Sequence, residues 1–306
     1  MNIVFMGTPG FAVPSLDILR RNGFNIVGVI TSVDKYGGRG MKKLIESDVK
    51  KYALQHGLRI LQPKNLKATE FVDELKSLKA DLQIVVAFRM LPEVVWDMPP
   101  LGTYNLHSSL LPKFRGAAPI NWSIIRGEKE TGVTSFKLQH KIDVGDILFQ
   151  EKIAIGDDES AGELHDRLME LGAKVVLKTA KAIKAGNVEL KPQDSSKASS
   201  APKIFKEDCE IDWSKSTKEV YDFIRGLSPY PGAWTTIDDK IFKIYKGWQE
   251  EYGQVVIPGK ILTDNKRYFK IATNDGFINV LDVKMQGKKR MDIKSFLNGY
   301  KLKKES

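Results

Sequence analysis

The fold is decided by residues 2–31, NIVFMGTPGFAVPSLDILRRNGFNIVGVIT. Two continuous apolar runs, Asn2–Met6 and Asn25–Thr31, predict buried strands, because a strand covered on both faces carries apolar residues without alternation. The segment between them predicts an amphipathic helix whose apolar face carries Phe11, Leu16, Ile18 and Leu19. A strand, a helix and a second strand in this order predict two parallel strands of one sheet.

The same alternation continues towards the middle of the chain. The further helices and strands that the pattern predicts are Asp48–His56, Arg59–Gln62, Leu66–Leu78, Leu82–Ala87 (a central strand), Gly102–His107, Thr131–Leu138, Asp146–Ile155 and Ala161–Ala185. Thr131–Leu138 and Asp146–Ile155 are expected to pair as a hairpin. We therefore predict an α/β fold: a Rossmann-like, doubly wound, mostly parallel sheet with helices on both faces.

The composition changes at Lys191–Lys203, which is rich in Ser, Ala, Lys and Pro and predicts a linker. After it come a short helix and several short strands with turn signals between them, a pattern that predicts a small β-barrel. These segments are Lys218–Gly226, Trp234–Ile237, Lys240–Tyr245, Gly253–Ile257, Tyr268–Ala272 and Phe277–Asp282. The predicted domains are 1–189, a linker at 190–206, and 207–306.

Composition excludes several classes of site. The single cysteine, Cys209, excludes an internal disulfide and a cysteine-based zinc cluster, and no metal site is predicted. No apolar segment is long enough to cross a bilayer and no leader is recognised, so a cytoplasmic protein without a membrane partner is expected. The formal charge of +10, with its excess after Lys260, indicates a polyanionic partner, although solubility alone is an alternative.

The chemistry-bearing stretch is Tyr104–Gly116, YNLHSSLLPKFRG. Asn105 and His107 are two apart on a predicted strand, so their side chains share a face at the end where open α/β sheets bind ligands. An amide can donate to an oxyanion, and an imidazole can move the proton that an attacking amine loses. Asp143, before Val144-Gly145-Asp146, is the candidate carboxylate that orients His107; a simple hairpin turn is the alternative reading.

The run Asn-x-His-x-Ser-Leu-Leu-Pro-x-x-Arg-Gly over residues 105–116, followed by Asp143–Asp146, resembles the folate-dependent formyltransferases. Gly116–Ile120 and Glu130–Thr134 are similar to the branch of that family whose acceptor is methionyl-tRNA. The resemblance extends from about Asn2 to Leu297. It implies 10-formyltetrahydrofolate as donor and the α-amine of methionine on initiator tRNA as acceptor, with an OB-like C-terminal barrel that binds the tRNA.

The resemblance also implies roles for individual residues. Asn105, His107 and Asp143 would be catalytic. The folate-binding residues would be Ser109, Leu110, Leu111, Pro112, Phe88, Arg89, Met90 and Leu91. The tRNA would be contacted by Arg39, Lys42 and Lys43 of the basic loop at residues 37–43, and by Lys206. No protein partner is implied.

Three alternatives remain at this stage. A formyltransferase with the same catalytic residues could act on a purine-pathway or sugar-nucleotide amine, although such an acceptor needs no basic C-terminal domain. A dinucleotide oxidoreductase lacks support, because Gly7-Thr8-Pro9-Gly10 does not match Gly-x-Gly-x-x-Gly. A non-catalytic RNA-binding protein would bind tRNA without turnover.

Overall fold

The computed structural model describes residues 1–37, 40, 43–252 and 256–301. The chain divides into two compact units. The first consists of Met1–Gly116, Thr131–Ile153 and His165–Ser200, and the second of Ala117–Glu130, Ala154–Leu164 and Ala201–Ser306. The second unit therefore includes two segments from within residues 1–189, and the first unit extends into the predicted linker.

The first unit is built on a seven-stranded sheet with the order β5-β2-β1-β6-β7-β8-β9. Its strands are β1 (Asn2–Gly7), β2 (Asn25–Ile30), β5 (Ile60–Leu61), β6 (Leu82–Val86), β7 (Thr103–His107), β8 (Glu130–Lys137) and β9 (Ile147–Ala154). The pairs from β5 to β7 are parallel, and β8 joins β7 antiparallel. The mostly parallel sheet predicted from the apolar runs is confirmed.

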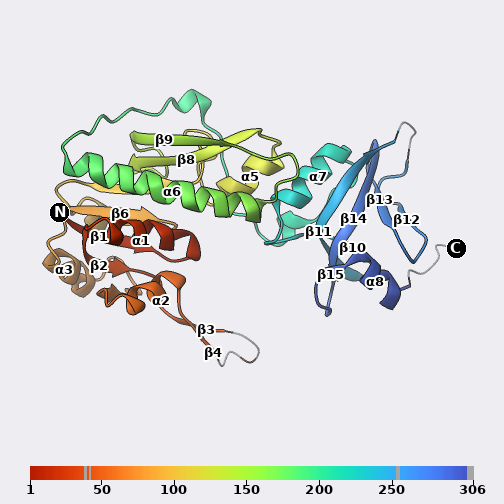
Figure 1. Cartoon of the computed structure of the whole chain (residues 1–306), viewed down its shortest axis with the longest axis horizontal. Coiled ribbons are helices and arrows are strands. Elements are labelled where there is room, and N and C mark those ends of the chain that lie inside the picture. The colour runs from red at the N-terminus through yellow and green to blue at the C-terminus, as the bar shows by residue number, and fades with distance from the viewer. Residues whose placement is uncertain (38–39, 41–42, 253–255, 302–306) are drawn as a thin grey trace. The chain divides into compact units, whose positions relative to one another are not determined.

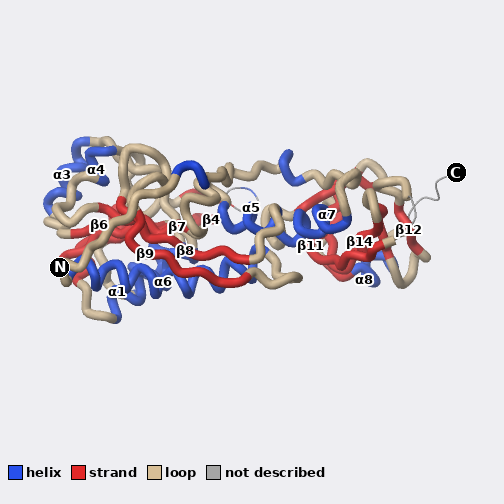
Figure 2. The backbone as a smooth tube through the Cα atoms, turned by 90° about the horizontal axis from the view of Figure 1, so that it is seen from above, coloured by secondary structure: helices blue, strands red, loops and turns tan. Residues whose placement is uncertain are grey.

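Helices cover both faces of this sheet (Figure 2). They are α1 (Val13–Arg21, after a 3-10 turn at Gly10–Ala12), α2 (Asp48–Gln55), α3 (Thr69–Ser77), α4 (Glu93–Trp96) and the long α6 (Ala161–Lys184). In Figure 2, α1 and α6 lie on one side of the strands and α3 and α4 on the other. Val4, Met6 and Val85 of the sheet are fully or almost fully buried with Phe71 and Leu75 of α3 in one apolar cluster.

A close approach of α6 to β7 fixes which face of that strand remains for chemistry. A Cβ on Gly172 of α6 would lie 2.6 Å from Cδ2 of Leu106, so only glycine leaves room for this leucine. Side chains alternate along a strand. Because Leu106 points towards α6, its neighbours Asn105 and His107 point to the opposite face.

A separate hairpin departs from the sequence prediction. Strands β3 (Lys35–Gly37) and β4 (Lys43–Ile45) pair antiparallel, with Tyr36 opposite Leu44. The sequence predicted only a loop over residues 37–43. In the structure, the paired strands β3 and β4 lie at the two ends of this segment. The sequence did not predict the hairpin because each strand is only three residues long.

The second unit contains a six-stranded antiparallel sheet, drawn blue in Figure 1, with β10-β11-β14-β13-β12 in order and β15 against β14. The strands are β10 (Ala233–Ile237), β11 (Lys240–Glu251), β12 (Ile261–Thr263), β13 (Phe269–Ala272), β14 (Gly276–Met285) and β15 (Met291–Asp292). The sheet curves into a half-barrel closed on its apolar side by α7 (Thr217–Gly226) and α8 (Ile293–Gly299). In its core the Phe242 and Phe269 rings stack, and the Phe296 ring packs against Phe242 at a tilt.

The predicted small β domain is thus confirmed, with one strand placed differently. The predicted strand Gly253–Ile257 falls partly on residues 253–255, outside the described residues, and Val256 and Ile257 are not in a strand. The sequence did not predict β12 or β15, whose three and two residues carry too short a pattern to stand out.

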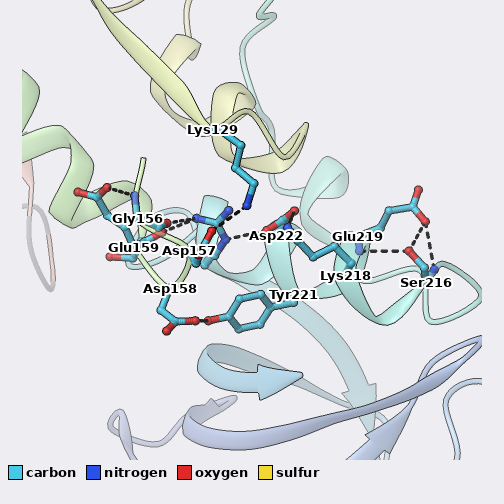
Figure 3. Close-up of polar contacts among 12 residues, drawn as sticks. Lys129, Gly156, Asp157, Asp158, Glu159, Ser216, Lys218, Glu219, Tyr221 and Asp222 are labelled. Carbon is cyan, nitrogen blue, oxygen red and sulfur yellow. Dashed lines mark hydrogen bonds and ion pairs between the residues drawn. The ribbon is translucent and has the colours of Figure 1, made fainter. Parts of the chain in front are cut away.

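A buried polar network explains why residues 154–164 belong to the second unit (Figure 3). The Arg225 guanidinium of α7 donates to Asp222 Oδ1 at 2.7 Å and to the Glu159 carbonyl at 2.8 Å. The Tyr221 hydroxyl donates to Asp158 Oδ1 at 2.7 Å. This hydrogen bond and burial raise the pKa of the Tyr221 hydroxyl well above its usual range, so it remains a donor. Among the described residues, none of the helices combines the length and the apolar character needed to cross a bilayer.

Candidate active site

The predicted amide and imidazole lie on β7 at its carboxyl end. Asn105 is opposite Val85 of the parallel β6, and His107 is opposite Thr134 of β8. The Asn105 side chain is partly buried and makes no hydrogen bond with another described residue. An amide at a sheet end with free donors is available to a ligand, since buried polar groups otherwise find partners within the protein.

His107 is held in one tautomer. Its ring is almost fully buried, and Nε2 lies 2.8 Å from the Phe114 carbonyl oxygen. A carbonyl oxygen can only accept, so Nε2 carries a proton. Nδ1 is therefore the nitrogen that exchanges a proton in the neutral ring.

Asp143 faces this second nitrogen. It lies on the turn between β8 and β9, and its Oδ2 is 3.8 Å from His107 Nδ1, with only 13% of its side chain exposed. The same oxygen accepts a hydrogen bond from the Gly116 amide at 2.9 Å. The structure thus brings Asn105, His107 and Asp143 to one site, although Asp143 is far from the strand in sequence. At 3.8 Å the carboxylate makes no direct hydrogen bond to the ring, and it attracts the ring when Nδ1 is protonated.

The Ser109–Pro112 segment forms a tight loop directly after β7. The Ser109 hydroxyl donates to the Lys113 carbonyl at 2.6 Å, and Thr134 Oγ1 donates to the Ser109 carbonyl at 2.6 Å. Ser109 and Leu111 are buried, Leu110 and Pro112 are partly exposed, and the Leu111–Pro112 peptide bond is cis. These hydrogen bonds hold the loop in place, and its partly exposed residues, Leu110 and Pro112, are accessible to a ligand.

The Phe88–Leu91 segment follows β6 and lines a groove. Residues 64–67 and 89–94 enclose about 910 Å³. The Arg89 guanidinium donates to the carbonyls of Lys64, at 3.0 Å, and Pro63, which orients it along the groove wall. Met90 is 76% exposed, so its apolar side chain is accessible to a molecule bound in the groove.

The predicted tRNA-contacting residues are placed only in part. Arg39 and Lys42 lie outside the described residues. Lys43 is exposed on β4, and Lys206 is exposed in the second unit, where its carbonyl accepts from Trp234 Nε1 at 2.8 Å. Part of the basic excess after Lys260 is neutralised within the unit, in the ion pairs Arg267–Asp264, Lys270–Glu250 and Arg290–Asp282.

In the predicted linker the sequence placed Lys206 in a site but not Gln193, which contacts the Asp143 turn. Its Nε2 donates to the Asp143 carbonyl at 3.0 Å and to the Gly145 carbonyl at 2.8 Å. No periodicity or motif marks a single glutamine among Ser, Lys and Pro residues. Within the part of the chain that the structure describes, no group of His, Cys, Asp and Glu side chains could hold a metal ion.

Comparison with known proteins identifies the family. Residues 1–180 match the formyl transferase family, and residues 203–301 match the formyl transferase C-terminal domain. This chain belongs to the formyltransferase family. Within that family, it is 50% identical over 311 aligned residues to a protein of Bacteroides fragilis named methionyl-tRNA formyltransferase, covering 99% of this chain and 96% of the relative.

Further relatives carry the same name. A methionyl-tRNA formyltransferase of Azobacteroides pseudotrichonymphae is 53% identical, covering 97% of this chain and 95% of the relative. One of Flavobacterium johnsoniae is 52% identical, covering 98% and 96%. These alignments include both parts of the formyltransferase chain, so the second unit is common to it and these relatives.

Solved structures share the formyltransferase fold at lower identity. HypX from Aquifex aeolicus in complex with tetrahydrofolic acid is 20% identical with a TM-score of 0.65, covering 96% of this chain and 46% of HypX. WlaRD, a sugar 3N-formyl transferase, is 20% identical with a TM-score of 0.68, covering 94% of this chain and 99% of WlaRD. At these identities the likeness shows the fold alone.

Proposed function

We propose that this formyltransferase moves the formyl group of 10-formyltetrahydrofolate to the α-amine of methionyl initiator tRNA, giving the N-formylmethionyl-tRNA that starts translation in the cytoplasm. The observation that carries the chemistry is the Asn105 amide, which has no partner among the described residues, beside the buried His107, with Asp143 facing its Nδ1. The choice of acceptor is supported by relatives named methionyl-tRNA formyltransferase that match nearly the whole chain.

The mechanism is direct attack of the amine on the formyl carbon. A carbon–nitrogen bond forms to the methionine nitrogen, and the bond to the folate nitrogen breaks. The Asn105 amide donates to the oxyanion of the tetrahedral intermediate, and the imidazolium that forms once His107 has accepted a proton stabilises the same charge. His107 Nδ1 takes the proton that the amine loses, and the Asp143 carboxylate stabilises the resulting imidazolium. The proton then passes to the leaving nitrogen.

The donor is assigned to the groove lined by residues 64–67 and 89–94 and to the Ser109–Pro112 loop. Main-chain groups of Phe88–Leu91 and the exposed Met90 side chain offer a polar edge and an apolar cover to a pterin-like ring. The braced Ser109–Pro112 loop offers a fixed apolar wall. A folate of this kind is what the fold's neighbour HypX is described as binding.

The central experiment is a formylation assay with purified chain, 10-formyltetrahydrofolate and charged initiator tRNA. Wild-type protein is expected to yield formylmethionine. Asn105→Ala is expected to lower kcat by about 10²–10³-fold, the usual effect of losing an oxyanion donor, and His107→Ala by at least as much. His165→Ala is the matched control, because His165 is a partly exposed histidine of α6 whose ring contacts Asp166 and Phe11. Absence of product with wild-type protein, or full activity of either variant, contradicts the proposal.

The tRNA is proposed to lie along basic surfaces that include Lys43, Lys206 and the exposed lysines after Lys260, with Arg39 and Lys42 in the loop at residues 37–43. Lys288→Glu with Lys289→Glu tests this, because both lysines are exposed on the turn after β14. The double variant is expected to weaken tRNA binding and lower its salt slope by about 1 for each lost phosphate contact. Lys174→Glu with Lys181→Glu, exposed on α6, is the matched control. Equal losses of tRNA affinity in the two double variants would contradict the proposed surface, because only the net charge of the chain would then matter for binding.

A further inference from the structure

Gln193 lies in a segment whose composition predicts a linker, but its side-chain amide is hydrogen-bonded at both ends. The nitrogen bonds the turn that carries Asp143, and the oxygen bonds Arg115. Its Nε2 donates to two carbonyls of that turn, those of Asp143 and Gly145, at 3.0 and 2.8 Å. Its Oε1 accepts from Arg115, at 3.1 Å from Nε and 2.7 Å from Nη2. The side chain is partly buried and has every polar atom in use.

Arg115 determines which way the amide faces. A guanidinium only donates, so its two hydrogen bonds require the amide oxygen of Gln193 on their side. The amide nitrogen must then face the turn, where carbonyl oxygens only accept. The orientation is therefore fixed chemically, and the reverse orientation would oppose donors to donors and acceptors to acceptors.

The turn that Gln193 holds needs an external support. Asp143 has φ = 52°, in the left-handed region that residues other than glycine avoid. Its side chain is fixed separately, through the Gly116 amide at 2.9 Å, next in sequence to Arg115. The contacts therefore close a ring from Asp143 to Gly116 and Arg115, through Gln193, and back to the Asp143 main chain.

We infer that Gln193 is a positioning residue for Asp143, which rests on the catalytic role proposed for that carboxylate. Gln193 contacts the main chain of Asp143 rather than any reacting atom. Its effect is to keep the left-handed turn in the one arrangement that directs Oδ2 to His107 Nδ1. Without Gln193 the turn can adopt other conformations, so the Asp143 carboxylate faces the His107 ring for a smaller fraction of the time.

Two variants separate this role from a general linker role. Gln193→Ala removes every contact of the amide. Gln193→Glu keeps an acceptor for Arg115 but has no N–H for the carbonyls of Asp143 and Gly145. Both variants are expected to lose about 10–100-fold in kcat, as for other residues that orient a catalytic group, with both KM values within about threefold of wild type. Lys197→Ala, exposed in the same segment, is the control and is expected to keep wild-type rates.

If Gln193→Glu keeps the wild-type kcat while Gln193→Ala loses it, the Arg115 contact alone matters and the inference is overturned. A double-mutant cycle gives a second readout. In an Asp143→Asn background, Gln193→Ala should lower kcat further by less than about threefold, since both changes act on one carboxylate. Fully multiplicative losses would mean that Gln193 acts elsewhere, and would overturn the inference.

Hydrogen exchange keeps this test separate from the formylation assay. In the Gln193→Ala chain, amides of residues 139–146 are expected to exchange faster than in wild type, while those of β6 are unchanged. Unchanged exchange at 139–146 overturns the inference, whatever the acceptor. If wild-type protein forms no formylmethionine but this exchange accelerates, the proposed acceptor is wrong and the positioning of the turn stands.

Discussion

The charge of Asp143 can be removed with little change of shape by Asp143→Asn. The amide keeps an oxygen that can accept from the Gly116 N–H, now 2.9 Å from Oδ2, so the turn is expected to persist. Two unit charges separated by the 3.8 Å between Oδ2 and His107 Nδ1 attract by about 4 kcal/mol at an effective dielectric constant near 20. The proposed imidazolium would lose this stabilisation, which corresponds to about a 10³-fold fall in rate.

Single-turnover formylation measures this step without product release. The variant is expected to bind folate and tRNA normally and to show a slow first turnover. Asp146→Asn is the matched control, because Asp146 lies three residues further along the same turn and its carboxylate contacts only Gln139, at 3.3 Å, among the described side chains. A single-turnover rate within tenfold of wild type for Asp143→Asn would refute the electrostatic role of the carboxylate.

Three other predictions concern stability and reactivity. Asp222→Ala leaves the buried Arg225 without its carboxylate and is expected to lower the free energy of unfolding of the second unit by about 3 kcal/mol in urea titrations; a change below about 1 kcal/mol would contradict the importance of this pair. Burial raises the pKa of the Cys209 thiol, so less thiolate forms at pH 8, and alkylation by iodoacetamide should be at least about tenfold slower than for a free peptide thiol until urea unfolds the chain. A Cβ at Gly145 would lie 1.7 Å from the Lys137 carbonyl, so Gly145→Ala should strongly reduce the melting temperature, whereas Gly299→Ala, with no atom within 4 Å, should change it little.

Continuous apolar runs made most of the first unit predictable. Strands β1, β6 and β7 are buried along most of their length, and β2 over its last three residues, so their apolar runs indicate strands without any knowledge of their partners. Strands β3, β4 and β12 lack such a run, because each has three residues and depends on pairing with its neighbouring strand. Residues 117–130 and 154–164 join the second unit through packing and buried polar contacts that no local pattern encodes.

The residues of the candidate site also differ in how far the sequence predicts them. Asn105 and His107 follow from strand periodicity and from the rule that ligands bind at the carboxyl ends of parallel strands. By its local sequence Asp143 is an ordinary turn residue, and only the family resemblance identifies it as a candidate catalytic residue. Gln193 could not be predicted, because its role depends on a chain reversal that brings residues 191–200 back alongside residues 114–116.

This reversal makes the predicted linker part of the catalytic unit. Phe114 has φ = 60° and Asp143 has φ = 52°, and each such conformation costs on the order of 1 kcal/mol, which contacts with the surroundings must offset. Ser199 Oγ accepts from the Phe114 amide at 2.9 Å, which helps to hold the carbonyl that fixes the His107 tautomer, and Gln193 holds the Asp143 turn. Both strained residues beside the imidazole are therefore supported by residues 193–199, so a domain that ended at residue 189 would contain Asn105, His107 and Asp143 without the contacts that hold Phe114 and Asp143 in place.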